Sequence, residues 1–594
     1  MRYHALAADF DGTLAHHGVI DDATWEALRT LRDSGRRLIM VTGRELDELL
    51  QLLPEPKVFD RIVAENGAVL YCPATKRERI AAPGPPSEFV AELIARNVGP
   101  ISVGRAIVAT WEPHQDTVLH VIREQGLELQ VIFNKGAVMV LPSGVNKATG
   151  LALALHDLGL SAHNVVAVGD AENDHALLAS SECGVAVDNA LPSLKHVADL
   201  VMRGDHGRGV AELIDMLLED DLASAPLHRH EVRLGQAGRR PIMLDPYAPS
   251  VMVCGTSGSG KSTLTTGLLE RLRDQGYQFA IVDPEGDYAS VESAVVLGGP
   301  NREPLVEEVL HVLQSTTDNV VVNLLGVSVE HRPEFFTKLL LALADLHTSS
   351  GRPHWLVVDE AHHLLPASWD PGGDLTVRTQ GTLYITVHPG SVAKSILRTL
   401  DTVLAVGEHP EETLREFARK AGLAPPEMEP IAKLDPGHAI YWRIGEEPIE
   451  IETERGTTER RRHSRKYTEG NLGHERCFFF RGPAARLNLK ARNLHSFIDL
   501  GEGVDEETWL FHLQRGDYSN WLRTQVKDVA LADAVAVVEA MAEATAEDSR
   551  RAIRAAIEAR YTLPVDEPTG RVDPTAPPSA RRSRSLDDAR ARRS

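Results

Sequence analysis

Residues 6–13 read LAADFDGT, a short apolar run that leads directly into two aspartates separated by one residue. Runs of the same kind recur along the chain, each ending in or leading into polar or glycine residues: LIMVTG (38–43), RIVAENG (61–67), VVAVGD (165–170) and CGVAV (183–187). Helical stretches alternate with these runs, so the pattern predicts a parallel α/β sheet over residues 1–218. A proline-rich entry followed by further β/α segments predicts an inserted α+β cap at about residues 73–142.

A second α/β series begins after residues 219–231, which lack periodicity and are interpreted as an interdomain linker. Its expected buried strands are VMVC (251–254), FAIVD (279–283), NVVVNL (319–324), WLVVDE (355–360), LYITVH (383–388) and TVLAV (402–406). Residues 232–450 are therefore predicted to form another domain of this type. The fold class expected for the whole chain is α/β, with two doubly wound parallel-sheet domains and a small helical module.

Three segments follow the second predicted domain. A charged run, ERGTTERRRHSRK, indicates a flexible joint at residues 451–466, and a stretch rich in Trp and Leu predicts a helical module over residues 467–547. Within that module, HLQRGDYSNWLR resembles a small helical domain of unknown function, which implies no chemistry. The tail, residues 564–594, is rich in Pro, Ser and Arg and is expected to be disordered.

Composition narrows the class of protein. A chain of 594 residues is expected to hold about four domains at ~150 residues each. Its four cysteines lie far apart and offer neither a disulfide framework nor a C-x-x-C metal site, which favours a cytoplasmic location. No apolar stretch is long enough to span a bilayer. The formal charge of −22 argues against a protein that coats nucleic acid over its whole surface, although a local basic channel stays open.

Two aspartates form the first candidate catalytic group. Asp9 and Asp11 lie at the end of a predicted strand, where alternate side chains point the same way and two carboxylates can share one site. Hydrolysis of a phosphate monoester needs both a nucleophile and charge neutralisation. One carboxylate can attack phosphorus, forming an aspartyl-phosphate, while the other moves protons. The pair therefore indicates phosphate-ester chemistry.

Four more polar residues complete this group. Asp170 and Asp174, in GDAEND after another predicted strand, supply the oxygen ligands that Mg²⁺ prefers. Thr42, after LIMV, and Lys147, before a predicted helix, add a hydroxyl donor and a cation for the phosphoryl oxygens. All of these residues lie near predicted strand or helix ends, where α/β sheets bind ligands.

These motifs, in this order, resemble those of the haloacid-dehalogenase (HAD) phosphatases, and the resemblance covers about residues 1–218. It implies that Asp9 is the nucleophile and Asp11 the general acid/base. The insertion is similar to the cap of the Cof-type and phosphoglycolate-phosphatase-like subgroup, in which caps select the substrate. The phosphate contacts and metal ligands that the resemblance implies are Thr42, Lys147, Asp9, Asp11, Asp170 and Asp174, with Asn173 at a position often found in the site.

The second candidate site is a phosphate cradle. GTSGSGKS (255–262) fits the G-x-x-x-x-G-K-[ST] pattern and lies between a predicted strand and a predicted helix, the context this motif requires. Backbone N–H groups would converge on the phosphates of ATP, and a buried strand about a hundred residues later ends in an Asp-Glu pair. Asp359 is the second expected Mg²⁺ ligand beside Ser262, and Glu360 orients the attacking water. The remaining expected nucleotide contacts are Gly255, Gly258, Gly260, Lys261 and Thr263.

GTSGSGKS, FAIVDPEGDY, WLVVDEAHHLLP and ITVHP resemble the HerA/FtsK group of hexameric ATPases over about residues 232–450. The resemblance implies nucleotide binding and assembly of several copies of the chain into a homo-oligomer, with a hexamer as the form that the resemblance suggests. It places His388 near the sensor position and Arg398 as an arginine finger for a neighbouring subunit. Two departures separate the chain from that group: a short segment stands where HerA proteins carry a barrel, and His388 replaces the more usual Gln.

Three hypotheses of function follow. The leading one is a bifunctional enzyme, a Mg²⁺-dependent phosphomonoester phosphatase whose activity or assembly is governed by an ATP-hydrolysing domain. The alternative is a DNA translocase or helicase-type ATPase with an auxiliary phosphatase domain. A scaffold without chemistry is disfavoured because Asp9, Asp11, Lys261 and Glu360 are intact. The expected partners are a small-molecule phosphate ester, ATP and further copies of the chain, with nucleic acid as a second candidate and no membrane.

Overall fold

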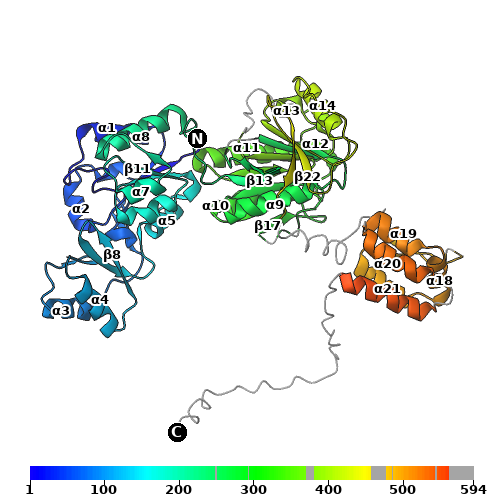
Figure 1. Cartoon of the computed structure of the whole chain (residues 1–594), viewed down its shortest axis with the longest axis horizontal. Coiled ribbons are helices and arrows are strands. Elements are labelled where there is room, and N and C mark those ends of the chain that lie inside the picture. The colour runs from blue at the N-terminus through cyan, green and yellow to red at the C-terminus, as the bar shows by residue number, and fades with distance from the viewer. Residues whose placement is uncertain are drawn as a thin grey trace, which may run out of the picture. The chain divides into compact units, whose positions relative to one another are not determined.

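The computed structural model describes residues 1–247, 250–289, 291, 293–369, 380–456, 477–484, 486–526, 528–541 and 545–560. The chain divides into two compact units, Met1–Glu459 and Arg460–Ser594 (Figure 1). The first unit contains both predicted α/β domains. Most of the predicted charged joint and the whole of the predicted disordered tail lie outside the described residues. In the described part of the chain, every helix is too short or too polar to cross a lipid bilayer.

The N-terminal domain is built on an eight-stranded sheet of order β12-β11-β10-β1-β2-β3-β4-β5. Strands β12 to β3 are parallel, and β4 and β5 continue the sheet antiparallel. The central strand β1 is buried at all four positions, as expected where helices cover both faces of a parallel sheet. Its strands and helices are β1 (Ala5–Ala8), α1 (Asp22–Asp33), β2 (Arg37–Val41), α2 (Leu46–Leu52), β3 (Arg61–Ala64), β4 (Val69–Cys72), β5 (Arg77–Ile80), α5 (Lys147–Leu158), β10 (Val165–Gly169), α6 (His175–Ala179), β11 (Cys183–Ala186), α7 (Pro192–Val197), β12 (Leu200–Val201) and α8 (His206–Asp220).

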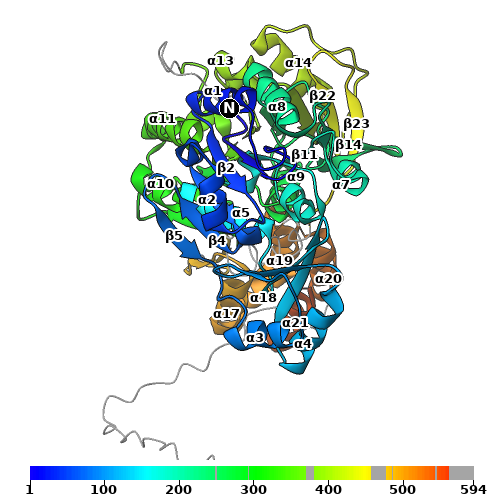
Figure 2. The ribbon, with the colours of Figure 1, turned by 90° about the vertical axis from the view of Figure 1, so that its left-hand side faces the viewer.

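The cap is a small α+β layer with a core of its own. Its antiparallel sheet has the order β6-β7-β9-β8, and Figure 2 shows α3 and α4 side by side against it. The insertion was expected to begin at about residue 73, but β5 pairs with β4 in the main sheet, so the separate layer starts later in the chain. Its elements are α3 (Ser87–Ala95), β6 (Ser102–Val103), β7 (Val108–Trp111), α4 (Gln115–Glu124), β8 (Leu129–Asn134) and β9 (Ala137–Pro142).

The second domain is built on an eleven-stranded mixed sheet of order β14-β13-β23-β22-β21-β15-β20-β19-β16-β18-β17. Helices α10 to α14 pack on one apolar face, and α9 packs on the other. The six predicted strands are all present, in the parallel part. Its elements are β13 (Val232–Ala237), β14 (Arg240–Leu244), β15 (Ser250–Gly255), α9 (Lys261–Asp274), β16 (Phe279–Asp283), β17 (Ala294–Gly298), α10 (Val306–Gln314), β18 (Asn319–Asn323), α11 (Arg332–Ser350), β19 (Trp355–Val358), α12 (Ala361–Leu364), β20 (Thr382–Thr386), α13 (Lys394–Leu397), β21 (Thr402–Val406), α14 (Pro410–Ala421), β22 (His438–Arg443) and β23 (Ile449–Thr453).

The edge of the second domain's sheet and the predicted interdomain linker differ from the sequence-based expectation. The sheet gains an antiparallel edge, because β13 pairs with both β14 and β23. The short segment before the phosphate-binding motif is therefore a hairpin joined to the end of the domain. The predicted linker, residues 219–231, overlaps the end of α8 and then docks on the N-terminal domain, where Arg229 Nε donates to Asp199 Oδ1 at 2.9 Å.

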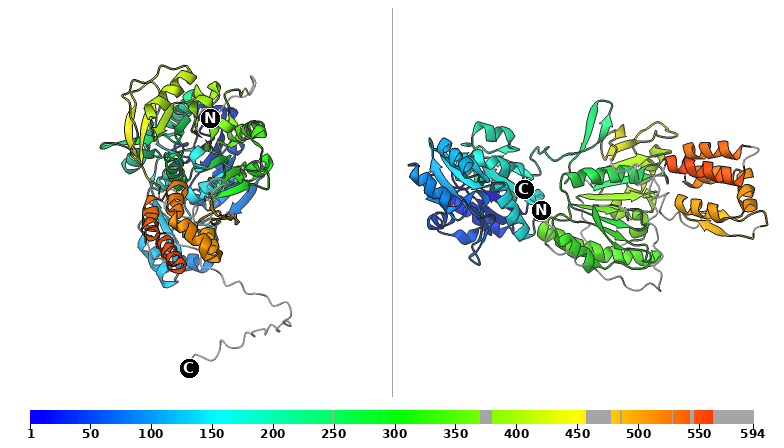
Figure 3. Two further views of the ribbon diagram at one scale, coloured as in Figure 1. Left: turned by 90° about the vertical axis from the view of Figure 1, so that its right-hand side faces the viewer. Right: turned by 90° about the horizontal axis from the view of Figure 1, so that it is seen from below.

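The second unit is a helical module with a two-stranded antiparallel sheet, coloured in orange and red in Figure 3. Aromatic side chains fill its core, including Phe480, Phe497, Trp509 and Tyr518. Trp509, Leu513, Trp521 and Leu522, from the stretch rich in Trp and Leu, are among the buried residues of this core. Its elements are β24 (Phe478–Phe480), β25 (Leu489–Ala491), α17 (Leu494–Gly503), α18 (Glu506–Gln514), α19 (Asp517–Trp521), α20 (Val529–Glu539) and α21 (Ala546–Arg560).

Candidate functional site

Three carboxylates meet at the carboxyl ends of β1 and β10. Asp9 directly follows β1, and Asp170 directly follows β10, its neighbour in the sheet. Asp174 is brought back to them by a short 3₁₀ turn, so that its Oδ2 accepts hydrogen bonds from the backbone N–H of Asp170 and Ala171, both at 3.0 Å. One oxygen of each carboxylate lies within 4.8 Å of the others, and all three residues are buried. Parallel pairing of adjacent strands therefore creates a site rich in oxygen ligands.

Lys147 neutralises part of this negative charge. It is the first residue of α5, whose start is fixed by a capping box on Asn146. Its Nζ lies 2.5 Å from Asp9 Oδ1 and 2.6 Å from Asp174 Oδ1. Burial raises the pKa of Asp9, and the neighbouring ammonium opposes that rise. Burial lowers the pKa of Lys147, but Asp174 and Asp9 together raise it more, so the lysine stays charged.

Asp11 faces a different cation. Its carboxylate accepts two hydrogen bonds from Arg44, from Nε at 2.6 Å and from Nη2 at 2.8 Å. The structure thus does not place the Asp11 side chain in the three-carboxylate group, although it was predicted as a metal ligand. Thr42, fully buried after β2, accepts a hydrogen bond from the Arg44 backbone N–H at 3.2 Å. Arg44 was not predicted as a site residue, even though it follows Thr42 by two positions.

A lysine from the cap reaches the same site. Lys135 lies in the turn between β8 and β9, and its Nζ is 2.8 Å from Asp170 Oδ2 and 3.2 Å from the backbone oxygen of Asp11. A Cβ at Gly12, where φ is +92°, would lie 2.3 Å from Asp170 Oδ2. Glycine is therefore needed for the loop to approach this closely. The ammonium of Lys135 marks a cation position formed by oxygens of two motifs.

Two further polar residues that were not predicted as site residues contact Asp170, one from the loop of Asp9 and one from the loop after β11. Thr13 Oγ1 donates to Asp170 Oδ1 at 3.3 Å, and Asn189 Nδ2 donates to Gly12 O at 2.7 Å and lies 3.4 Å from Asp170 Oδ2. Asn189 comes shortly after the carboxyl end of β11, the same signal that identified the other motifs. Asn173 instead donates to Asn66 at 2.8 Å.

The second site is formed at the carboxyl end of β15. Lys261, the first residue of α9, directs its Nζ to the backbone oxygens of Gly255 and Thr256, both at 3.0 Å. Burial lowers the pKa of this lysine. At Gly255, where φ is +148°, a Cβ would lie 2.1 Å from Val406 O on β21, so a side chain cannot be accommodated. Gly258, Gly260, Ser262 and Thr263 lie along the same turn and first helical turn.

Acidic residues at the ends of β19 and β16, in the same sheet, lie near this turn. Asp359 and Glu360 directly follow β19, which is separated from β15 by β20. Burial raises the pKa of Asp359, as do Asp283 and Glu360 close by. Burial also raises the pKa of Glu360, with Lys261 acting against the rise. Asp283, at the end of β16, holds the following loop by accepting hydrogen bonds from four successive backbone N–H groups, residues 285–288.

His388 and Arg398, the two residues assigned from the HerA/FtsK resemblance, lie in different surroundings. The backbone N–H of His388 donates to Thr386 Oγ1 at 3.1 Å, and the same hydroxyl lies 3.1 Å from Nδ1 of His362. His388 thus lies two residues after β20, with its ring centroid 5.6 Å from that of His362, and its sensor role stays a prediction. Arg398, which follows α13, is exposed, and its Nε lies 3.4 Å from Ala421 O within the same chain.

Known proteins resemble the two domains separately. A family model for haloacid dehalogenase-like hydrolases matches residues 6–96 and 119–214, and a model for AAA domains matches residues 245–379. The phosphoglycolate phosphatase of Methanothermobacter thermautotrophicus is 30% identical over 222 residues, covering 35% of this chain and 96% of that protein. That of Pyrobaculum neutrophilum is 30% identical over 220 residues, covering 36% and 95%. A haloacid dehalogenase-like hydrolase from Bacteroides thetaiotaomicron, of known structure, is 20% identical with a TM-score of 0.33, covering 36% of this chain and 99% of that one.

Proposed function

The chain belongs to the haloacid dehalogenase-like hydrolases through its N-terminal domain and carries an AAA-type P-loop domain, and from this premise we propose that it is a bifunctional enzyme. The first activity is hydrolysis of a phosphate monoester through an aspartyl-phosphate. The observation that carries the proposal is the buried group of Asp9, Asp170 and Asp174 with the Lys147 ammonium between two of them. It provides a nucleophile, metal ligands and a charge-neutralising cation in one place.

In the proposed reaction Asp9 attacks phosphorus, and the leaving alkoxide takes a proton from Asp11. The hydrogen bonds from Arg44 orient Asp11 for this transfer and for the later deprotonation of water. Lys147 opposes the rise that burial causes in the pKa of Asp9 and holds the Asp9 carboxylate in position. Thr42 is proposed to donate to a phosphoryl oxygen.

The residues present fit a Mg²⁺ ion. Asp9, Asp170 and Asp174 are hard oxygen donors, and the Lys135 ammonium, which contacts Asp170 and the Asp11 carbonyl, supports a cation position there. Bound there, Mg²⁺ would neutralise charge on the phosphoryl group. Lys135 would then be released from Asp170 and become available to a substrate anion.

The cap suggests the class of substrate. Lys135 places a cation on the cap side of the cluster, where it can pair with a second negative group of a small phosphate ester. The relatives named above are phosphoglycolate phosphatases, whose named substrate combines a phosphate with a carboxylate. We therefore propose a small carboxylated phosphate ester, with phosphoglycolate as the first compound to test.

The second activity is ATP hydrolysis in the P-loop domain. Lys261 and Ser262 would hold the phosphates and Mg²⁺, Asp359 would be a further ligand, and Glu360 would orient water. The exposed Arg398 is available to a neighbouring subunit, which supports assembly of several copies on the HerA-like pattern. We propose that this domain regulates or assembles the phosphatase. A DNA-translocating motor is the alternative.

Phosphate release by purified full-length variants tests both activities. Wild type, Asp9→Asn and Lys261→Ala are compared with Mg²⁺ on phosphoglycolate, on a panel of other phosphate esters and on ATP, with and without DNA. We expect Asp9→Asn to abolish ester hydrolysis and keep ATP turnover, and Lys261→Ala to abolish ATP hydrolysis while ester hydrolysis persists at a changed rate if the P-loop domain regulates it. Intact ester hydrolysis in Asp9→Asn would refute the phosphatase mechanism. ATP turnover that requires DNA would favour the motor over the regulatory role.

A further inference from the structure

A second group of metal-ligating side chains lies where the two α/β domains of the first unit meet. His163 precedes β10, Glu182 precedes β11, and His230 precedes β13 at the end of the docked segment. His163 Nδ1 is 2.7 Å from Glu182 Oε2, and His230 Nε2 is 3.7 Å from the same oxygen. One ligand atom of each residue lies within 4.8 Å of the others. The group shares no residue with either phosphate site.

The hydrogen bonding of His163 calls for a positive charge between it and Glu182. His163 Nε2 lies 2.8 Å from the backbone oxygen of Gln275, which can only accept, so Nε2 carries a hydrogen. In a neutral ring Nδ1 is then a lone pair, and it faces a carboxylate oxygen at 2.7 Å. Two acceptors at that distance repel unless a proton lies between them or a metal ion binds both, and a metal ion would move the two atoms apart to about 3.3 Å, the separation of tetrahedral zinc ligands.

His230 distinguishes the metal ion from the proton. Its Nε2 is buried and has no hydrogen-bond partner among the described residues, yet it is directed at the same Glu182 oxygen. A proton on His163 satisfies the His163–Glu182 pair and leaves His230 Nε2 unsatisfied. A metal ion binds all three groups. Two imidazole nitrogens with one carboxylate form a ligand set used by zinc, which leaves a fourth position for water.

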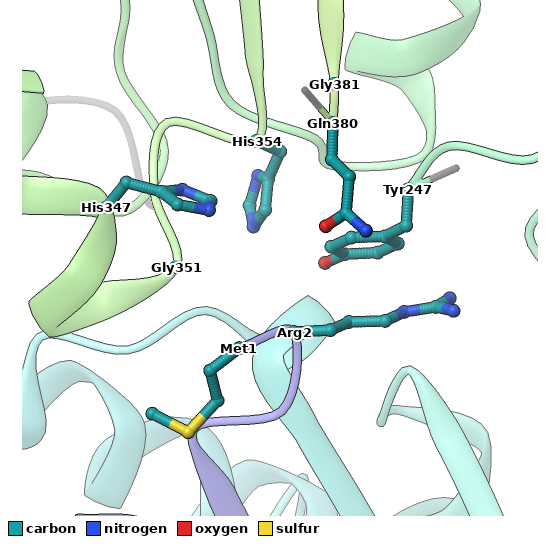
Figure 4. A pocket seen from close by; sticks show the side chains of 8 residues that line it. All are labelled: Met1, Arg2, Tyr247, His347, Gly351, His354, Gln380 and Gly381. Atoms are coloured by element: carbon teal, nitrogen blue, oxygen red, sulfur yellow. The ribbon is translucent and has the colours of Figure 1, made fainter. Parts of the chain in front are cut away.

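The surroundings complete an outer shell of the kind that orients metal ligands. Glu182 accepts hydrogen bonds from Tyr277, whose hydroxyl is 3.0 Å from Oε2, and from Arg2, whose Nη2 is 2.7 Å from Oε1. Arg2 in turn lies over the ring of Tyr247, with Cζ 4.0 Å from the centroid (Figure 4). Gln275 directly follows α9, and the carbonyl end of a helix carries partial negative charge that favours a nearby cation.

We propose that His163, Glu182 and His230 bind one Zn²⁺ ion at the junction of the phosphatase and P-loop domains. The outer contacts from Gln275 and Tyr277 come from the P-loop domain, at the far end of the helix that begins with Lys261. The ion thus fastens the end of the nucleotide-binding helix to the phosphatase domain. The site differs in chemistry from the oxygen-lined phosphatase centre, so the two metals can be separated.

Zinc binding by the full-length chain tests this site. Protein stripped with chelator is first saturated with Mg²⁺, which occupies the carboxylate site, and is then titrated with Zn²⁺ or with Co²⁺ as a coloured substitute. Wild type is compared with His230→Ala, with His230→Cys, which keeps a zinc ligand, and with the control His228→Ala. His228 lies on the same segment, is largely exposed and bonds to Glu231.

We expect about one equivalent of tightly bound Zn²⁺ in wild type and His228→Ala. Affinity should fall at least about 100-fold in His230→Ala and be largely kept in His230→Cys, while Tyr277→Phe should lose about 10–100-fold as an outer-shell change. Co²⁺ should give the strong visible absorption of a four-coordinate site in wild type but not in His230→Ala. Equal zinc affinity in wild type and His230→Ala would overturn the proposal. So would a wild type that binds no zinc, which would show that the charge beside His163 is a proton.

Discussion

The two candidate phosphate sites of this chain hold their lysines in different ways. Lys147 lies between the buried carboxylates of Asp9 and Asp174, whereas Lys261 contacts two backbone oxygens of its own loop. In the first site, cations of the chain balance much of the acidic charge before any ligand binds. In the second, Asp359 and Glu360 form no ion pair with Lys or Arg in the described part of the chain.

This difference indicates how each site depends on its ligands. In the first site Lys147 already lies between Asp9 and Asp174 before substrate enters, so this part of the site is pre-organised. Burial raises carboxyl pKa values in both sites, those of Asp9 and Asp170 in the first and those of Asp359 and Glu360 in the second. The lysines differ: carboxylates outweigh burial and raise the pKa of Lys147, whereas burial lowers that of Lys261 because nearby carboxylates offset it only in part. Bound phosphates would supply negative charge beside Lys261, and a divalent cation would supply positive charge beside Asp359 and Glu360. We therefore expect ligands to stabilise the second site more than the first.

Replacement of Lys147 should have the largest effect. Lys147→Ala leaves two buried carboxylates without their shared cation, which costs roughly 3–5 kcal/mol when a buried ion pair is broken. We expect ester hydrolysis to fall at least about 10³-fold and the Tm to fall by roughly 10 °C. Phosphate release and thermal unfolding measure the two effects. A variant with normal Tm would contradict the view that this site is pre-organised by ion pairs.

Replacement of Lys261 should separate activity from stability. Lys261→Ala removes the cation for the ATP phosphates, so ATP turnover should fall at least about 10²-fold. The ligand-free chain should change by less than about 1 kcal/mol, because lost hydrogen bonds to two carbonyls are offset by removal of a buried charge. Denaturant unfolding with and without Mg²⁺ and ATP checks this. A loss of stability as large as that of Lys147→Ala would remove the distinction between the sites.

Replacement of Lys135 should affect substrate choice more than catalysis. Lys135→Ala removes the cap cation while the three carboxylates and Lys147 stay in place. We expect kcat/KM for phosphoglycolate to fall about 10–100-fold, with a smaller change for esters that lack a second negative group. Arg123, on the cap helix α4, provides a matched control for loss of a cap cation. Equal losses for all esters would place Lys135 in the chemistry rather than in recognition.

The smallest predicted effect concerns pH, and both domains should show it. His4 in the phosphatase domain and His362 in the P-loop domain are neutral in the fold, since burial lowers the pKa of each from 6.5 to about 4. Unfolding lets each ring take up a proton between about pH 6.5 and about pH 4, so stability is present above this window and lost as pH falls through it. His4→Gln and His362→Gln should each reduce the acid-induced fall in Tm by about 2–4 °C. Thermal unfolding from pH 7.5 to 4.5 measures it, and an unchanged pH slope would argue against a neutral buried ring.

Much of the fold was predictable because strand ends carry a local signal. Each predicted strand of the two parallel sheets is present, and the fold class is confirmed by its match to known families. The antiparallel edge strands β13, β14, β22 and β23 were missed. They are as long as the predicted strands but partly exposed, and their pairing joins the two ends of the domain, which no local pattern records.

The site residues likewise divide into those that the local sequence predicted and those whose positions depend on tertiary contacts. Asp9, Asp170 and Lys147 were predicted because each stands at the end of a strand or the start of a helix, and the structure brings them together. Their catalytic roles remain predictions. Lys135 was missed because its position depends on the cap folding over the cluster. Asp11 was predicted as a metal ligand because the local sequence does not reveal its bond to Arg44, which joins the loops after β1 and β2.

The sequence by itself determined the two phosphate-binding motifs, their order and the α/β class of both domains, because apolar periodicity and the residues at strand ends are local properties. Only the tertiary structure decided which charges neutralise one another. It paired Lys147 with two carboxylates, left Lys261 on backbone oxygens and brought His163, Glu182 and His230 together at the domain junction. Electrostatic energy depends on distance and burial, and both are set by contacts between segments far apart in the chain.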